Sequence, residues 1–557
     1  MAELHSETDI PWWQSGVVYQ IYPRSFMDSD GDGVGDLPGV QQRLDHLVEL
    51  GVDALWLSPF YTSPMKDFGY DVADYCDVDP LFGTLDDARQ LIASAHTKGL
   101  RVIVDFVPNH TSDLHPWFVE SRSSRTNPKR DWYVWRDGRP GSVQGEEVAP
   151  NNWLSHFGGI AWTWDRSTQQ WYLHSFLREQ PDLNWRNAEV RAAMMDVIRF
   201  WLDQGVDGFR LDVAHYIAKD PELRDNPWRP RDVEDLGFKD RGEFSRMIHV
   251  NTHSHVDIHE WYAELRHVLD THDVAHRGVT PRYSVGEIHL FNWAEWAKFY
   301  GTGPGTSLHM PFNFSLIKTG WDAPAIRAAI EACEAVVPAW GWPNWVLGNH
   351  DEPRVATRFG GEAAARAAMV VLLTLRGTPT MYYGDELGLP DTPITAEQMQ
   401  DPWGINVQGL GLGRDPERTP MPWDDTPNAG FSPPGATPWL PLGHPSINVA
   451  AQRNDPSSVY SLTRSLLALR RRRAALSVGS WSPISTGDDG VVAYERRAAG
   501  EPAIVVAVRV GGATGGVALG GGTGVVLVRS TSGTVGDAVD LGSVTLGADE
   551  AVVIERQ

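Results

Sequence analysis

Three acidic residues follow short apolar runs of the sequence, where the ends of buried strands are expected. Asp212 follows VDGFRL, Glu287 follows YSVG and Asp351 follows WVLGNH. In a parallel barrel, the C-terminal strand ends gather around one opening, and active sites are built there. Carboxyls that meet at such an opening can act as an acid and a base. The pattern therefore predicts an active site based on carboxyl groups.

The surroundings of each acid favour a different role in cleaving a glycosidic bond, which needs one ionised and one protonated carboxyl. Arg210 lies two residues before Asp212, on the same face of the strand, and its charge favours an ionised nucleophile. Glu287 follows an apolar stretch, which predicts a raised pKa and the role of general acid and base. Asp351, directly after His350, is placed to bind sugar hydroxyls or to stabilise the oxocarbenium charge.

A second acidic motif, DSDGDGVGD at residues 28–36, has the spacing of a metal-binding loop. Positions 1, 3, 5, 7 and 9 are Asp28, Asp30, Asp32, the Val34 carbonyl and Asp36. Position 12 is Gly39 rather than the glutamate of an EF-hand. We predict a structural Ca2+ site, with Mg2+ as the alternative, and no organic cofactor.

The elements that must position these residues alternate between apolar runs and helical patterns. Helices are predicted over 38–51, 85–99, 188–205 and 458–473. Strand candidates are 17–23, 54–59, 101–110, 206–215, 283–289, 307–313, 345–354 and 378–386. Eight strands in alternation with helices predict an α/β protein with a (β/α)8 TIM barrel.

Other segments interrupt or follow this rhythm. The barrel is predicted over 1–110 and 185–477, with a loop-rich excursion at about 387–440. Residues 111–184 are rich in Trp, Pro, Asn and Arg, and we expect an inserted domain after the third strand. Residues 478–557 alternate Val and Thr with Gly-rich turns, which predicts a C-terminal antiparallel β-domain.

Composition excludes several classes of partner. The 557 residues carry a net charge of −24, which argues against binding nucleic acid or anionic membranes. Cys76 and Cys333 are the two cysteines, too few for a disulfide framework. No apolar run has the length of a signal peptide core or a membrane helix. We expect a soluble cytoplasmic protein that acts on a small substrate as a monomer or homodimer.

The chain resembles the α-amylase family of glycoside hydrolases, and within it the α-glucosidase and oligo-1,6-glucosidase branch. The motifs that carry the resemblance are WWQSGVVYQIYPRSF (12–26), GYDVADY (69–75), DFVPNH (105–110), GFRLDVAH (208–215), VGEI (285–288), LGNHDEPR (347–354) and RTPMPWD (418–424). The resemblance implies that Asp212 is the nucleophile, Glu287 the acid and base, and Asp351 a stabiliser of the transition state.

The same resemblance implies which residues bind the terminal glucose: Asp71, His110, Arg210, His350 and Arg418. A pair between Asp71 and Arg418 would close the site beyond that glucose and give exo action. The resemblance also implies a covalent glucosyl-enzyme and retention of anomeric configuration, and it supports the metal loop.

The bond cleaved is less sharply indicated. In similar enzymes, Val after the nucleophile, as at Val213, often accompanies α-1,6 activity, whereas the context Val-Ala-His at 213–215 is closer to enzymes that accept maltose. We expect α-1,4 cleavage with some α-1,6 tolerance.

A transglycosidase, such as a trehalose synthase or a sucrose-isomerising enzyme, would use the same acids and is the alternative. A catalytically dead transporter subunit of this fold would lack the three acids, and it is rejected.

Overall fold

Eight short parallel strands form the central sheet of the protein in the computed structural model, which describes residues 10–139, 148–230, 241–272, 281–531 and 535–557. Their hydrogen-bonded order is β11, β10, β9, β5, β2, β1, β13 and β12. The strands are β1 (Val18–Ile21), β2 (Ala54–Leu57), β5 (Arg101–Phe106), β9 (Gly208–Leu211), β10 (Tyr283–Gly286), β11 (Met310–Pro311), β12 (Asn344–Val346) and β13 (Thr378–Tyr382). The two ends of this order are linked, because the Asn313 N–H after β11 donates to Asn344 Oδ1 in β12 (2.9 Å). The predicted barrel is confirmed.

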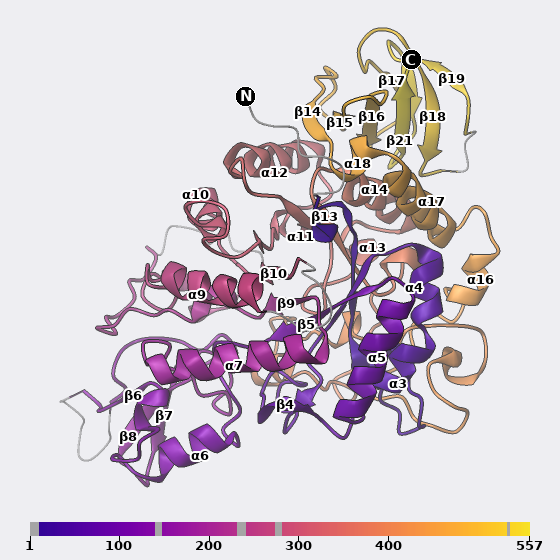
Figure 1. Ribbon diagram of the computed structural model, residues 1–557. Coiled ribbons are helices and arrows are strands. Elements are labelled where there is room, and N and C mark those ends of the chain that lie inside the picture. The colour runs from indigo at the N-terminus through magenta and orange to yellow at the C-terminus, as the bar shows by residue number, and fades with distance from the viewer. Residues whose placement is uncertain (1–9, 140–147, 231–240, 273–280, 532–534) are drawn as a thin grey trace.

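Helices cover the outside of the barrel, so the strands are buried on both faces, as their continuous apolar runs require (Figure 1). The helices after successive strands are α4 (Leu44–Leu50), α5 (Leu85–Thr97), α7 (Ala188–Gln204), α9 (Ile258–Thr271), α10 (Trp293–Ala297), α12 (Ala323–Val336), α14 (Glu362–Thr374) and α17 (Val459–Arg472). None of the described helices is long and apolar enough to cross a membrane.

The helix predicted over 38–51 is divided in two. Residues Leu37–Gln42 form α3, and α4 begins after Arg43, whose backbone leaves the helical region. The Arg43 side chain lies over the Trp423 ring (4.4 Å) and donates to the Gly430 carbonyl (3.1 Å). The break accompanies these contacts with the segment after the last strand. The predicted end at Gly51 is confirmed, since this glycine caps α4 with a left-handed φ of 99°.

Two segments that are not part of the alternating strands and helices lie at the C-terminal ends of the barrel strands. Residues 111–184 contain α6 (Pro116–Ser123) and a three-stranded antiparallel sheet of β6 (Trp135–Arg136), β7 (Trp162–Asp165) and β8 (Gln170–Leu173). The segment between β13 and α17 contains the short helices α15 (Pro402–Asn406) and α16 (Val449–Arg453) together with 3-10 turns and irregular loop, as its Pro and Gly content predicts. The division into domains at residues 110, 184 and 477 stays a prediction.

The C-terminal region is an antiparallel sheet packed beside α14 and α17, shown in yellow in Figure 1. Its strand order is β14, β15, β16, β21, β18 and β19, with β17 and β20 as a separate pair. The strands are β14 (Ser480–Pro483), β15 (Val491–Arg497), β16 (Ile504–Arg509), β17 (Gly515–Val517), β18 (Thr523–Arg529), β19 (Ala538–Asp540), β20 (Val544–Leu546) and β21 (Ala551–Arg556). One face of this sheet continues the hydrophobic core of the barrel. The predicted antiparallel sheet is confirmed.

Candidate active site

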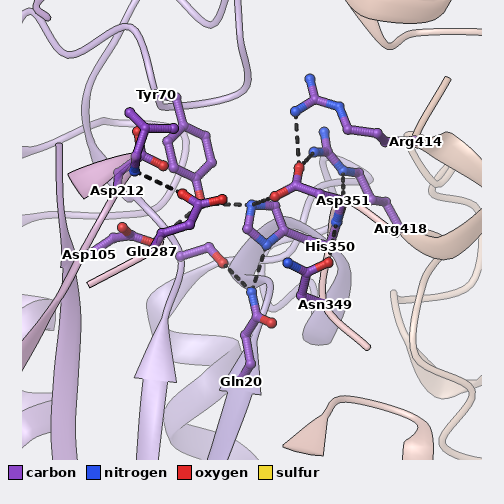
Figure 2. A network of polar contacts seen from close by, with 12 residues as sticks. Gln20, Tyr70, Asp105, Asp212, Glu287, Asn349, His350, Asp351, Arg414 and Arg418 are labelled. Carbon is purple, nitrogen blue, oxygen red and sulfur yellow. Dashed lines mark hydrogen bonds and ion pairs between the residues drawn. The ribbon is translucent and has the colours of Figure 1, made fainter. Parts of the chain in front are cut away.

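The ends of β9 and β10 bring Asp212 and Glu287 to one edge of the sheet. The Asp212 N–H donates to the Phe106 carbonyl (2.8 Å), and the Glu287 N–H donates to the Leu211 carbonyl (2.9 Å). The parallel hydrogen-bond pattern therefore continues one residue past each strand, and the carboxyls leave neighbouring strands together. Asp351 comes from the loop after β12 and faces them across the opening (Figure 2).

Arg210 is the centre of the carboxylate cluster. Its side chain is fully buried, and Nη1 donates to Asp105 Oδ1 (2.8 Å) and to Asp212 Oδ1 (2.8 Å). Nη2 donates to Glu287 Oε2 (2.6 Å). The contact with Asp212 follows from the strand alternation, whereas the contact with Glu287 depends on the neighbouring strand. One guanidinium thus binds a carboxyl from each of three strands.

The pKa values of these acids differ from the expectation drawn from the sequence. Burial and the neighbouring carboxylates raise the pKa of Asp212 well above its ordinary value although Arg210 opposes them, so the expectation that Arg210 alone keeps Asp212 ionised is corrected. Burial also raises the pKa of Glu287, but Arg210 and a hydrogen bond from His289 outweigh it, so the net direction is downward. The predicted raised pKa of Glu287 is therefore corrected. Its apolar strand supplies the burial, but the sequence did not reveal the two basic partners.

Asp351 is held ionised by basic neighbours. Its Oδ1 accepts from Arg414 Nη1 and Arg418 Nη2, both at 3.0 Å, and His350 Nε2 lies 3.3 Å from Oδ2. Burial opposes ionisation, but the charges of Arg414 and Arg418 hold the pKa of Asp351 well below its ordinary value. A permanent carboxylate at this position can stabilise a developing positive charge.

His350 is fixed in a stack of rings. It lies parallel to Tyr70, with ring centroids 5.4 Å apart and the Tyr70 hydroxyl 2.7 Å from Nε2, and it also stacks on Tyr22 (5.7 Å). Its Nδ1 lies 2.7 Å from the Gln20 amide nitrogen, which can only donate, so Nδ1 is the acceptor and Nε2 carries the proton. Burial lowers the pKa of His350 to about 3, so the ring is neutral.

The predicted glucose-binding residue Asp71 does not reach the cavity. Its buried carboxylate accepts from Ser63 Oγ and from the backbone N–H groups of Lys66 and Asp67, all at 2.9 Å. Asp67 lines the cavity instead. Phe68 and Gly69 have positive φ angles of 50° and 107°, and the tight turn that they form separates the two acids. The sequence offered both acids in one loop but gave no signal of this turn.

Arg418, the predicted partner of Asp71, does not line the cavity either, and Arg414 lies there in its place. Arg418 is fully buried behind the cavity, where its Nε donates to the His350 carbonyl (2.6 Å). Arg414 lines the cavity and its Nη2 donates to Asp67 Oδ1 (2.9 Å) and to Asp401 Oδ1 (2.7 Å). The predicted Asp71–Arg418 pair is thus wrong, and Asp67 pairs with Arg414. Both arginines lie four residues apart in one loop, and the sequence alone did not distinguish them.

A cavity of about 460 Å³ opens above these residues. His110 lies in its wall, with Nε2 3.1 Å from the Gln180 amide and 3.2 Å from the Tyr70 carbonyl, and burial lowers its pKa to about 4. Aromatic side chains that the sequence analysis did not single out form much of the remaining wall: Phe157, Phe176, Tyr216, Phe244, Phe291 and Trp403. The volume suits a small ligand.

Comparison with known proteins identifies the family. The model of the α-amylase catalytic domain matches residues 20–479. This chain belongs to the α-amylase family. A probable α-glucosidase of Rhizobium meliloti (strain 1021) is 43% identical over 490 residues, covering 86% of each chain. An oligo-1,6-glucosidase of Parageobacillus thermoglucosidasius is 37% identical over 533 residues, covering 89% of this chain and 90% of that protein.

Solved structures of the α-amylase family give the same result. An α-glucosyl transfer enzyme, XgtA, superposes with a TM-score of 0.90 at 41% identity, covering 99% of this chain and 100% of the other. The trehalulose synthase MutB of Pseudomonas mesoacidophila MX-45 superposes with a TM-score of 0.86 at 34% identity, covering 98% and 100%. The chain is a glycoside hydrolase whose relatives include both glucosidases and transferring enzymes.

The acidic loop of this α-amylase-family chain lies between β1 and α3. Carboxylate oxygens of Asp28, Asp30 and Asp36 lie within 4.8 Å of one another. Asp36 also caps α3 by accepting from the Gly39 N–H (2.6 Å), and burial raises its pKa although hydrogen bonds oppose this. Asp32 is turned toward the backbone, where it accepts from the Val34 N–H (2.7 Å). Three converging hard oxygen ligands fit a divalent cation, which would offset their mutual repulsion.

Proposed function

We propose that this protein is an exo-acting retaining α-glucosidase that releases terminal α-linked glucose from maltose and short oligosaccharides. The contact of Arg210 with both Asp212 and Glu287 carries the proposal. Oxygens that bind the two terminal nitrogens of one guanidinium lie close together, which favours the short carboxyl separation of about 5–5.5 Å in retaining enzymes. An inverting enzyme needs roughly 6.5–9.5 Å, because a water molecule stands between its carboxyls.

In the proposed reaction, Asp212 attacks the anomeric carbon while Glu287 protonates the departing glycosidic oxygen. The glucosyl ester on Asp212 is then opened by water, which gives its proton to Glu287. Asp351 lies opposite the nucleophile and supplies negative charge where the ring becomes positive. The negative charge of Asp351 is not cancelled by His350, because that ring is neutral, and its buried surroundings exclude water that would screen it.

Exo action is supported by the cluster at one end of the cavity. Arg414 joins Asp67, Asp401 and Asp351 into a buried group of alternating charges. Such a wall leaves room for the hydroxyls of a terminal glucose but not for a continuing chain. Asp67, which lines the cavity, offers carboxylate oxygens to those hydroxyls.

For the bond cleaved, we propose α-1,4 preference with some α-1,6 tolerance. Val213 borders the cavity with a strained φ of 35°, and its N–H donates to Glu287 Oε2 (2.8 Å). The alternatives are an oligo-1,6-glucosidase and a transferring or isomerising enzyme on the same scaffold, and the relatives include an oligo-1,6-glucosidase, an α-glucosyl transfer enzyme and a trehalulose synthase. Product analysis on maltose, isomaltose and sucrose distinguishes the three.

The stereochemistry of the first product tests the proposal directly. We expect maltose to release α-glucose, which proton NMR detects within the first minutes, before mutarotation. Initial β-glucose would contradict the retaining mechanism and the roles of Asp212 and Glu287 together.

For the acidic loop, we propose a structural Ca2+ bound by Asp28, Asp30 and Asp36, with Mg2+ as the alternative. The convergence of three carboxylates supports it. The other predicted ligands, Asp32 and the Val34 carbonyl, would complete the coordination after Asp32 turns away from the Val34 N–H. The ion would hold the loop between β1 and α3 and take no part in the chemistry.

A further inference from the structure

The two carboxylate oxygens of Glu287 have different surroundings. Oε2 accepts from Arg210 Nη2 (2.6 Å) and from the Val213 N–H (2.8 Å). Oε1 has one partner among the described residues, His289 Nε2 at 2.7 Å. An oxygen that receives a cationic donor and a backbone N–H retains negative charge. The proton that Glu287 donates must therefore be carried on Oε1, beside His289.

The His289 ring is held in a fixed orientation. It stacks on Phe314 with ring centroids 4.6 Å apart and an interplanar angle of 6°. Its side chain is 29% exposed, lines the cavity and lies two residues beyond Glu287 on the loop after β10. The ring thus lies beside Oε1 in the wall of the cavity.

We propose that His289 is a positioning residue that shares one proton with Glu287 Oε1 and keeps this acid supplied with it. The proposal rests on the assignment of Glu287 as general acid. It accounts for a general acid whose pKa is lowered by Arg210 and His289 despite burial. A carboxyl of that kind would be deprotonated alone, but a pair that retains one proton can still deliver it.

The proton is conserved through the cycle. Before reaction, it lies between His289 Nε2 and Glu287 Oε1. It passes through Oε1 to the glycosidic oxygen as the bond to C1 breaks and Asp212 binds C1, which leaves His289 as the neutral Nδ1–H tautomer. In the second step, water gives a proton to Oε1 as it displaces Asp212, and that proton is again shared with His289.

The other titratable groups around His289 do not supply this proton. His215, on the turn after β9, lies 5.9 Å away by ring centroids, and burial lowers its pKa to about 3. Burial and the charge of Arg241 lower the pKa of His156. Lys318 lines the same cavity and is paired with Glu352 at 2.6 Å. Among the described residues, Glu287 also faces the charged groups of Arg210, Asp105, Asp212 and Asp351.

Two substitutions test the proposal through the pH dependence of kcat/KM. His289→Gln keeps a hydrogen-bond donor but cannot titrate, and His289→Phe keeps the ring on Phe314 but has no donor. In both, the basic limb of the profile on maltose should move to lower pH by about one to two units, as expected when a carboxyl replaces a His–Glu pair. The acid limb, which belongs to ionisation of Asp212, should stay in place. The loss of kcat/KM in both variants should be smaller on an activated aryl glucoside, because its leaving group needs less protonation.

His96→Gln is a matched control, because His96 Nε2 also lies 2.7 Å from a carboxylate oxygen, on Asp207, with 27% of its side chain exposed. It should leave the profile unchanged. A shift in His289→Phe but not in His289→Gln would mean that the ring only orients Glu287, and it would overturn proton sharing. An unshifted limb in both folded variants would also overturn it. A separate variant, Glu287→Gln, tests the assignment of Glu287 as general acid. If that assignment is wrong, this variant should lose activity on maltose and on the aryl glucoside equally.

Discussion

At the scale of residues, one buried arginine organises the proposed reacting groups. Arg210 binds Asp105, Asp212 and Glu287, so a single side chain sets the distance between the proposed nucleophile and the proposed acid. Such a cluster is costly to disrupt, because loss of one partner from a buried pair leaves an uncompensated charge worth about 3–5 kcal/mol. Changes at Arg210 would therefore alter folding and chemistry together, and the roles are better tested at the periphery of the cluster.

The wall proposed to bind glucose offers such a test. Asp67 and Asp401 both accept from Arg414 Nη2, but Asp67 lines the cavity whereas Asp401 is fully buried. Asp67→Asn should lower kcat/KM on maltose by about 10- to 100-fold, the effect of losing a hydrogen bond to a charged group. Asp401→Asn should mainly lower Tm, with a smaller loss of activity. Steady-state kinetics and calorimetry would contradict the assignment if the two variants lost activity equally.

At the scale of elements, loops supply the basic partners of Asp351 and the proposed metal ligands, which do not lie at strand ends. The segment after β13 carries Arg414 and Arg418 back over the barrel to Asp351, more than sixty residues earlier in the chain. The loop after β1 carries the proposed metal site and leads into α3 through the Asp36 cap. Both loops lack long regular structure, so their shape depends on specific polar contacts.

The metal loop gives the prediction at this scale. Removing the ion with a chelator should lower Tm, because a ligand that binds only the folded state stabilises it by mass action. Initial rates at low temperature should stay nearly unchanged. In Asp30→Asn, the chelator should have much less effect on Tm.

Asp540→Asn is the control for this prediction. Its Oδ1 accepts from the N–H two residues later at 2.8 Å, as Asp30 Oδ1 does at 3.1 Å, and both side chains are exposed. This variant should respond to the chelator like the unaltered protein. A Tm that does not depend on the chelator in any of the three proteins would remove the metal from the proposal.

At the scale of the whole molecule, the barrel and the C-terminal sheet share one hydrophobic core. Tyr494 in β15 and Val553 in β21 belong to the same buried cluster as the barrel strands. Polar contacts reinforce this interface, because Tyr494 Oη lies 2.6 Å from Thr374 Oγ1 at the end of α14. The two regions are therefore expected to unfold together.

Heating tests this expectation. Loss of activity should coincide with a single calorimetric transition, and Tyr494→Phe should lower its Tm slightly, since one buried hydrogen bond contributes about 1 kcal/mol. Tyr283→Phe is the control, because the described residues offer no hydrogen-bond partner for that buried hydroxyl. Two separate transitions, with only one shifted by Tyr494→Phe, would show that the regions unfold independently.

The sequence by itself determined the eight strands, four of the helical segments around them and the strand ends that carry Asp212, Glu287 and Asp351, whereas the helices α9, α10, α12 and α14 were not predicted. These features were readable because apolar runs and helical periodicity are local, and a parallel barrel brings all its strand ends to one opening. The contact between Arg210 and Asp212 followed for the same reason, since residues two apart on a strand share a face.

Only the tertiary structure decided which side chains meet across that opening. It turned Asp67 rather than Asp71 toward the cavity and paired it with Arg414 rather than Arg418. It also placed Arg210 and His289 on Glu287 and so reversed the direction expected for its pKa. The physical reason is that loop turns and contacts between distant segments fix these partners, whereas local periodicity carries no information about them.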